Sequence, residues 1–142
     1  MIEYKLTYSN VGTTPPQTGT VSQAHIHFGK SRDSGGILVF FCTNSGNGPT
    51  GVMTPSCPAN SGTVTGTWTK ANVVAIPGQN VEAGNFDALV EALKSNTAYA
   101  NIHTIPMPGA PSTVTAYPGG EIRGQVRSKE EEEEEQREHQ QK

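Results

Sequence analysis

Short segments that alternate between apolar and polar residues, or are apolar throughout, recur along the chain between glycines and prolines. Apolar residues occupy every second position of Ile2–Tyr8, the period of a half-buried strand. Ile37–Cys42 is apolar throughout, which predicts a strand covered on both faces at the centre of the core. Further strands are predicted over Val21–Phe28, Gly62–Thr69, Ala98–Thr104 and Gly120–Val126. The pattern therefore predicts a mostly β, antiparallel fold.

One segment has helical periodicity instead. Apolar residues recur at i, i+3, i+4 and i+7 from Phe86 to Leu93, with Asn85 placed to cap the first turn. We expect this short helix to cover one open end of the sheets, within a domain that spans residues 1–128. The tail, residues 129–142, contains six consecutive glutamates and is expected to be either disordered or a solvated helix.

Composition and charge exclude several classes of function. The 142 residues suit one domain, and 16 glycines with 10 prolines favour many turns. Seven of the 13 acidic residues lie in the tail, so residues 1–128 carry a formal charge of +1. A nearly neutral domain lacks the clustered positive charge that binds nucleic acid. No apolar run approaches the roughly 20 residues that span a bilayer, and Met1 precedes a strand-like pattern rather than a signal-peptide core.

The two cysteines, Cys42 and Cys57, flank a segment rich in glycine, serine, asparagine and proline. A disulfide between them would restrict this loop and would indicate an oxidising compartment. The alternative is a pair of free thiols, one buried and one exposed. Two cysteines are too few for a zinc site made of cysteine alone, which needs about four ligands.

Three of the four histidines lie at corresponding positions of predicted strands. His25 and His27 are two residues apart, so both side chains leave the same face while Ile26 points to the core. His103 lies on the polar face of Ala98–Thr104. If the strands are neighbours, three imidazoles converge on one metal ion, since imidazole suits copper, zinc, nickel or iron. The alternative is a polar sheet face turned to water.

The last predicted strand adds polar residues to this setting. Glu121, Arg123 and Gln125 share one face, with Ile122 and Val126 behind it. Arg123 would then lie near the histidines. Glu121 is expected to pair with Arg123 or to accept hydrogen bonds from a neighbouring strand. It has no obvious second carboxylate as a partner for acid–base catalysis.

Other chemistries have less support from the sequence. Neither a Gly-x-Ser-x-Gly nucleophile elbow nor a lysine-bearing phosphate loop is found. Met107, in a proline-rich segment, is a candidate soft ligand for Cu(I). His139 lies in the charged tail and is expected to be solvated.

Three segments together resemble the CHRD (chordin-type) family. They are Ala24–Gly29 (AHIHFG), Asn101–Thr104 (NIHT) and Pro118–Val126 (PGGEIRGQV). Family members carry His-Ile-His followed by glycine, then a helical segment, then Val-Asn-Val-His-Thr and Pro-Gly-Gly-Glu-Ile-Arg-Gly-Gln. The resemblance covers roughly Ile2 to Val126. Members usually begin with one strand more than this chain shows, so the edge of Ile2–Tyr8 is expected to be open or filled by a partner.

The resemblance implies an immunoglobulin-like sandwich or barrel, as found in secreted or envelope proteins of bacteria and in chordin. The His-x-His strand is also similar to the copper-binding strand of copper–zinc superoxide dismutases. Carried over, this likeness makes His25, His27 and His103 copper ligands and makes Arg123 the catalytic group that steers superoxide.

Two functions follow as expectations, and whether the protein is an enzyme stays open. The first is an extracellular or cell-envelope β module that binds a protein or surface partner, or self-associates through an open sheet edge, with a three-histidine face for metal. The second is a mononuclear copper protein with superoxide dismutase-like activity. Copper is preferred to zinc in both.

Overall fold

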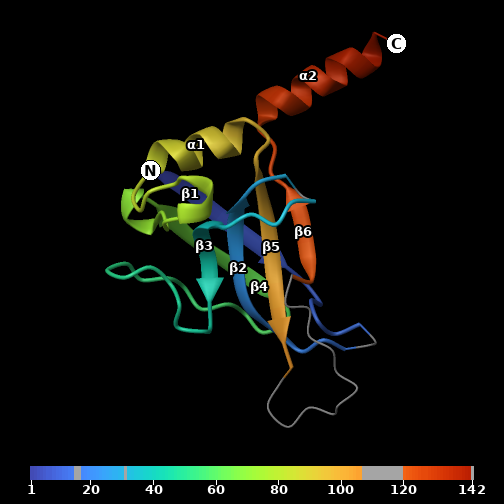
Figure 1. Cartoon of the computed structure of the whole chain (residues 1–142). Helices are drawn as coiled ribbons and strands as arrows, with labels where there is room; N and C mark the ends of the chain where they lie inside the picture. Colours follow the sequence, from blue (N-terminus) through green and yellow to red (C-terminus); the bar gives the residue numbers. More distant parts are fainter. Residues whose placement is uncertain (15–16, 31, 107–119, 142) are drawn as a thin grey trace.

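Six strands and two α-helices make up the computed structural model, which describes residues 1–14, 17–30, 32–106 and 120–141 (Figure 1). The strands are β1 (Ile2–Tyr8), β2 (Thr20–Phe28), β3 (Ile37–Thr43), β4 (Gly62–Trp68), β5 (Ala98–Ile105) and β6 (Ile122–Gln125). The helices are α1 (Phe86–Lys94) and α2 (Lys129–Gln140), with two short 3₁₀ turns, Lys70–Asn72 and Pro77–Gln79, between β4 and α1. The sequence pattern did not predict these two turns.

The strands form two antiparallel sheets that face each other across the core. One sheet has the order β3-β2-β5-β6, and the other consists of β1 and β4. The predicted mostly β, sandwich-like arrangement is confirmed. Among the described residues, β1 pairs with β4 alone.

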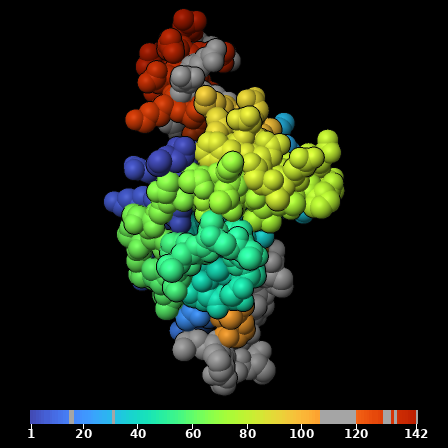
Figure 2. All heavy atoms as spheres, turned by 90° about the vertical axis from the view of Figure 1, so that its left-hand side faces the viewer, coloured from blue at the N-terminus to red at the C-terminus, as the bar shows by residue number. Residues whose placement is uncertain are grey.

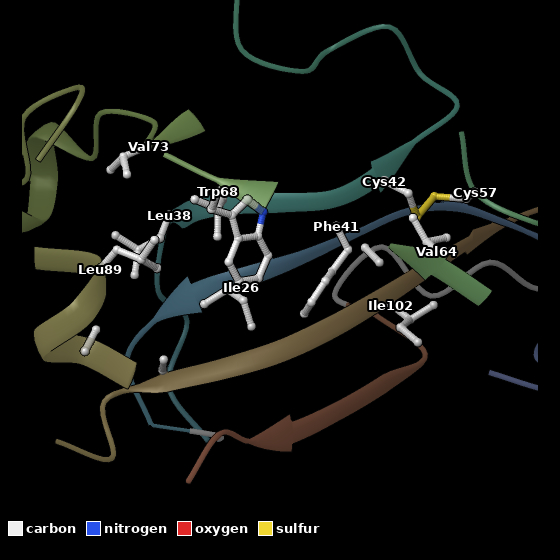
Figure 3. Packing of buried hydrophobic residues seen from close by; sticks show 14 of the residues in the cluster. Ile26, Leu38, Phe41, Cys42, Cys57, Val64, Trp68, Val73, Leu89 and Ile102 are labelled. Carbon is white, nitrogen blue, oxygen red and sulfur yellow. A yellow bond between two sulfur atoms is a disulfide. The ribbon is translucent and has the colours of Figure 1, made fainter. Parts of the chain in front are cut away.

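Aliphatic side chains fill the space between the sheets together with a few aromatic rings, among them Trp68 and Phe41 (Figure 3). Trp68 is only 3% exposed and stacks on Tyr4 with ring centroids 4.4 Å apart. Its indole Nε1 donates a hydrogen bond to the Phe40 carbonyl oxygen at 2.8 Å, and the Tyr4 hydroxyl donates to the Phe41 carbonyl oxygen at 2.8 Å. The buried indole N–H is therefore satisfied within an apolar core, and the partly buried Tyr4 hydroxyl is satisfied as well.

Helix α1 covers one end of the sheets, as the periodicity predicted (Figure 1). The Asn85 side chain caps it by accepting a hydrogen bond from the Ala88 N–H at 3.1 Å. Leu89 and Ala92 are its buried residues, and both belong to the core cluster. The helix therefore contributes packing rather than chemistry.

A disulfide joins Cys42, in β3, to Cys57, as predicted. By the chain-entropy relation, closing a loop of about 15 residues stabilises the fold by about 3 kcal/mol. Within this loop the Asn44 amide is fixed on both sides: it donates to the Cys57 and Val21 carbonyl oxygens and accepts from the Cys57 N–H. The loop after β3 is therefore held against β2.

The acidic tail contains α2, which projects from the end of the domain beyond α1 (Figures 1 and 2). An ion pair between Arg127 and Glu135, 2.6 Å long, joins it to the preceding segment. Both side chains are exposed, so the pair contributes little stability. Of the helices in the described ranges, none has the length and apolar character to cross a membrane.

Candidate metal centre

The structure brings His25, His27 and His103 together on one face of the four-stranded sheet. β2 and β5 are direct neighbours, and His103 lies opposite Gln23, one alternate position away from His25. One ring nitrogen from each of the three histidines lies within 4.8 Å of the other two. No second group of metal-binding side chains accompanies them in the part of the chain that the structure describes.

This face is not turned to water, which corrects the alternative interpretation of a solvated polar face. His25 is 2% exposed and His27 is 8% exposed. The segment between β2 and β3 covers His27, because the Gly35 carbonyl oxygen lies 2.8 Å from its Nδ1. The Phe40 ring meets His25 edge-on with centroids 4.7 Å apart. Two imidazoles are therefore enclosed, and enclosed polar groups need partners.

Both enclosed imidazoles are neutral near pH 7. Burial lowers the pKa of His25 to about 3, with the neighbouring His103 and His27 acting in the same direction. Burial also lowers the pKa of His27, against the hydrogen bond to Gly35, which raises it. Neutral imidazole is the form that binds metal ions.

The hydrogen bonds indicate which nitrogen carries the proton in each ring. A carbonyl oxygen can only accept, so His27 Nδ1–H donates to Gly35, and its Nε2 keeps a lone pair. His25 Nε2 lies 2.9 Å from Gln23 Oε1, which also accepts a hydrogen bond from Asn47 Nδ2. With the amide oriented in this way, His25 Nε2–H donates and its Nδ1 keeps a lone pair.

These assignments leave two lone pairs facing each other. His27 Nε2 and His25 Nδ1 are 3.3 Å apart. With the two tautomers assigned above, neither nitrogen carries a hydrogen to donate to the other. Two nitrogens bound about 2.0–2.1 Å from one ion at a tetrahedral angle lie about 3.3–3.4 Å apart. The spacing of this nitrogen pair therefore suits a shared cation.

Arg123 reaches the site through an aromatic ring. Its guanidinium lies 4.3 Å from the centre of the Tyr99 ring, and that ring stacks on His27 at 4.9 Å with an angle of 6° between the planes. The guanidinium also donates to the carbonyl oxygen of Asp33, and its charge helps to lower the pKa of His27. Arg123 is therefore near the histidines, as expected, with Tyr99 between them.

Glu121 accepts hydrogen bonds from a neighbouring strand, one of the two roles expected for it. Its Oε2 accepts from the hydroxyls of Thr18 and Thr104, which are 3% and 2% exposed. The carboxylate thus joins the end of β5 to the segment before β2. Among the described residues it forms no ion pair with Arg123, and β6 begins only after it, at Ile122.

Replacing Gly120 with alanine should lower the free energy of unfolding by about 2–4 kcal/mol. Gly120 has φ +101°, a conformation that side-chain-bearing residues rarely adopt, and an added Cβ would meet the buried Asn101 amide. Gly124→Ala is the matched control, because a Cβ there meets no atom within 4 Å among the described residues. Urea unfolding measures both; equal losses would contradict the expected conflict at Gly120.

Sequence reasoning found the three histidines but not the groups that hold them. Strand alternation places Gln23 on the same face as His25, so the sequence pattern could have identified Gln23 as part of the site. No sequence pattern could have identified the Gly35 carbonyl or Asn47, because both belong to loops. Met107, the candidate Cu(I) ligand, lies outside the described residues.

Comparison with protein-family models matches residues 1–126 to the CHRD domain. The matched range includes all six strands, α1, the three histidines and Arg123, and it ends before α2. No curated protein and no solved structure matches the chain.

Proposed function

This chain belongs to the CHRD domain family, and we propose that its β sandwich holds one transition-metal ion at His25, His27 and His103. The observation that carries the proposal is the enclosed pair of ring nitrogens, His25 Nδ1 and His27 Nε2, which lie 3.3 Å apart and which the tautomers assigned above leave as acceptors. In a metal-free core two such acceptors repel each other, whereas one cation satisfies both.

The donor set favours copper over zinc. Imidazole nitrogens bind both ions, but Cu(II) binds nitrogen sites more tightly than Zn(II) in the general affinity order of divalent ions. His103 completes the set with a small inward movement, since its ring centre is 4.9 Å from that of His25 and 6.3 Å from that of His27. Three protein ligands leave room for a further ligand on the ion, as in catalytic metal sites.

The disulfide and the family support a place outside the cytoplasm. Disulfides persist in oxidising compartments, so the Cys42–Cys57 bridge suits an extracellular or cell-envelope domain. In that setting the domain would act as a binding or assembly module that carries metal. The edge of β1 that β4 does not use is the surface where a protein partner, or a second copy, would add a strand.

Metal loading tests the proposal directly. Wild-type protein exposed to Cu(II) and passed through a column to remove excess metal should retain about one copper per chain, with an electron paramagnetic resonance spectrum of several nitrogen ligands. His103→Ala should lower the affinity at least 100-fold, roughly the loss of one ligand. His139→Ala, which removes the exposed histidine of α2, is the matched control and should behave as the wild type. Substoichiometric copper in the wild type, or equal affinity in His103→Ala, would refute the site.

A further inference from the structure

We infer that a hydrogen-bond chain of Thr43, Asn47 and Gln23 fixes the tautomer of His25 and thereby selects Nδ1 as its metal-binding atom. The inference rests on the proposed metal site and names three residues that control it without touching the ion. Two of them, Thr43 and Asn47, lie at the end of β3 and in the loop that follows.

The chain begins at the Thr43 hydroxyl. This oxygen accepts a hydrogen bond from the Ser45 N–H at 3.1 Å, and its own hydrogen is directed to Asn47 Oδ1 at 2.6 Å. With Oδ1 facing Thr43, the other end of the amide, Nδ2, faces Gln23 and donates to its Oε1 at 2.9 Å. In this arrangement the orientation of each group matches that of the next.

The last hydrogen bond of the chain joins Gln23 to the His25 imidazole. Gln23 Oε1 accepts from Asn47 and from His25 Nε2 at 2.9 Å. A neutral imidazole carries one N–H, so a proton on Nε2 leaves Nδ1 free to bind. His25 Nδ1 then faces His27 Nε2, whose tautomer the Gly35 carbonyl fixes in the complementary sense.

The register of the sheet explains why these residues meet. Gln23 lies directly opposite Thr43 in the β2–β3 pairing, and the register shifts between Ala24 and His25. The shift falls within β2, between Gln23 and His25, the two residues that the last hydrogen bond of the chain joins. Asn47 completes the connection because the loop returns over this pair.

Reversing the Gln23 side-chain amide would leave His25 Nδ1 unable to bind a metal ion. If Gln23 turned its Nε2 toward His25, the imidazole would have to accept there, and its proton would move to Nδ1. That proton would then be donated to His27 Nε2, and the 3.3 Å gap between the two atoms would become an ordinary hydrogen bond. A metal ion would have to displace it.

Asn47→Asp produces this reversal. The carboxylate that replaces the amide only accepts, so the Gln23 side chain should turn its Nε2 toward this carboxylate and His25. Long-range ¹H–¹⁵N NMR of the metal-free protein should show His25 protonated on Nε2 in the wild type and on Nδ1 in the variant. Competition titration with Cu(II) should show an affinity about 10–100-fold lower, the range for residues that orient ligands.

Two further variants separate this effect from charge and from folding. Asn10→Asp adds the same charge at an exposed asparagine in the β1–β2 connection and should match the wild type in both measurements. Gln23→Glu keeps an acceptor for His25 Nε2–H and for Asn47, so it should preserve the wild-type tautomer in the metal-free protein.

The outcomes distinguish this inference from the metal site itself. A proton on His25 Nδ1 in the wild type, or wild-type tautomer and affinity in Asn47→Asp, overturns the inference while the metal site stands. A wild-type protein that binds no copper overturns the proposed function, whereas the tautomer is read in metal-free protein and is decided independently.

Discussion

A His25→Leu variant should lose copper binding while its metal-free form remains at least as stable as the wild type. Copper affinity should fall at least 1,000-fold, roughly the effect of removing a central ligand and its orientation. In the metal-free protein, the substitution removes His25 Nδ1, a nitrogen acceptor that lies 3.3 Å from the acceptor His27 Nε2. Gln23 Oε1 keeps its hydrogen bond from Asn47, so the substitution leaves that acceptor satisfied.

The expected change in the free energy of unfolding lies between no change and a gain of about 1–2 kcal/mol, because replacing a poorly satisfied buried polar group by an apolar one is often neutral or stabilising. Urea unfolding in the presence of a chelator measures it. A purely structural His25, valued for its hydrogen bond to Gln23, would instead make the variant about 1–3 kcal/mol less stable. That result would remove the main physical argument for the metal site.

The second large effect is expected at Trp68. Trp68→Ala should lower the free energy of unfolding by about 3–5 kcal/mol, since it empties the centre of the core and leaves the Phe40 carbonyl without its donor. The Tyr4 ring would also lose its stacking partner.

Trp68→Phe is the matched control for this prediction. It keeps an aromatic ring against Tyr4 but loses the indole N–H, so the loss should be clearly smaller than for alanine. Denaturant unfolding followed by far-ultraviolet circular dichroism measures both variants. A loss of less than about 2 kcal/mol in Trp68→Ala would show that the core closes over the missing ring.

The fold followed from the sequence wherever one sheet face packs on the core. Ile2–Tyr8 was predicted with the bounds of β1, and the wholly apolar Ile37–Cys42 became β3, which is buried along most of its length. The prediction was wrong at Ile122, expected behind the polar face but 46% exposed. β6 is one of the two outer strands of the four-stranded sheet, and among the described residues it pairs with β5 alone.

The candidate site was predictable only in part. Period-two alternation placed His25 and His27 on one face, and the register with β5 added His103. Alternation cannot say whether a face is covered, and here the covering group includes the backbone of Gly35, which has no signature in the side-chain pattern. Asn47 was missed for the same reason, because its role depends on how a loop folds back.

Trp68 has a further consequence for experiments on this protein, as it is the chain's single tryptophan. Its indole N–H donates a hydrogen bond to the backbone carbonyl of Phe40, the residue whose ring lies against His25. A paramagnetic ion such as Cu(II) quenches indole emission at short range. If the histidine cluster binds Cu(II) as proposed, the intrinsic fluorescence of the unlabelled protein should fall as the metal is added.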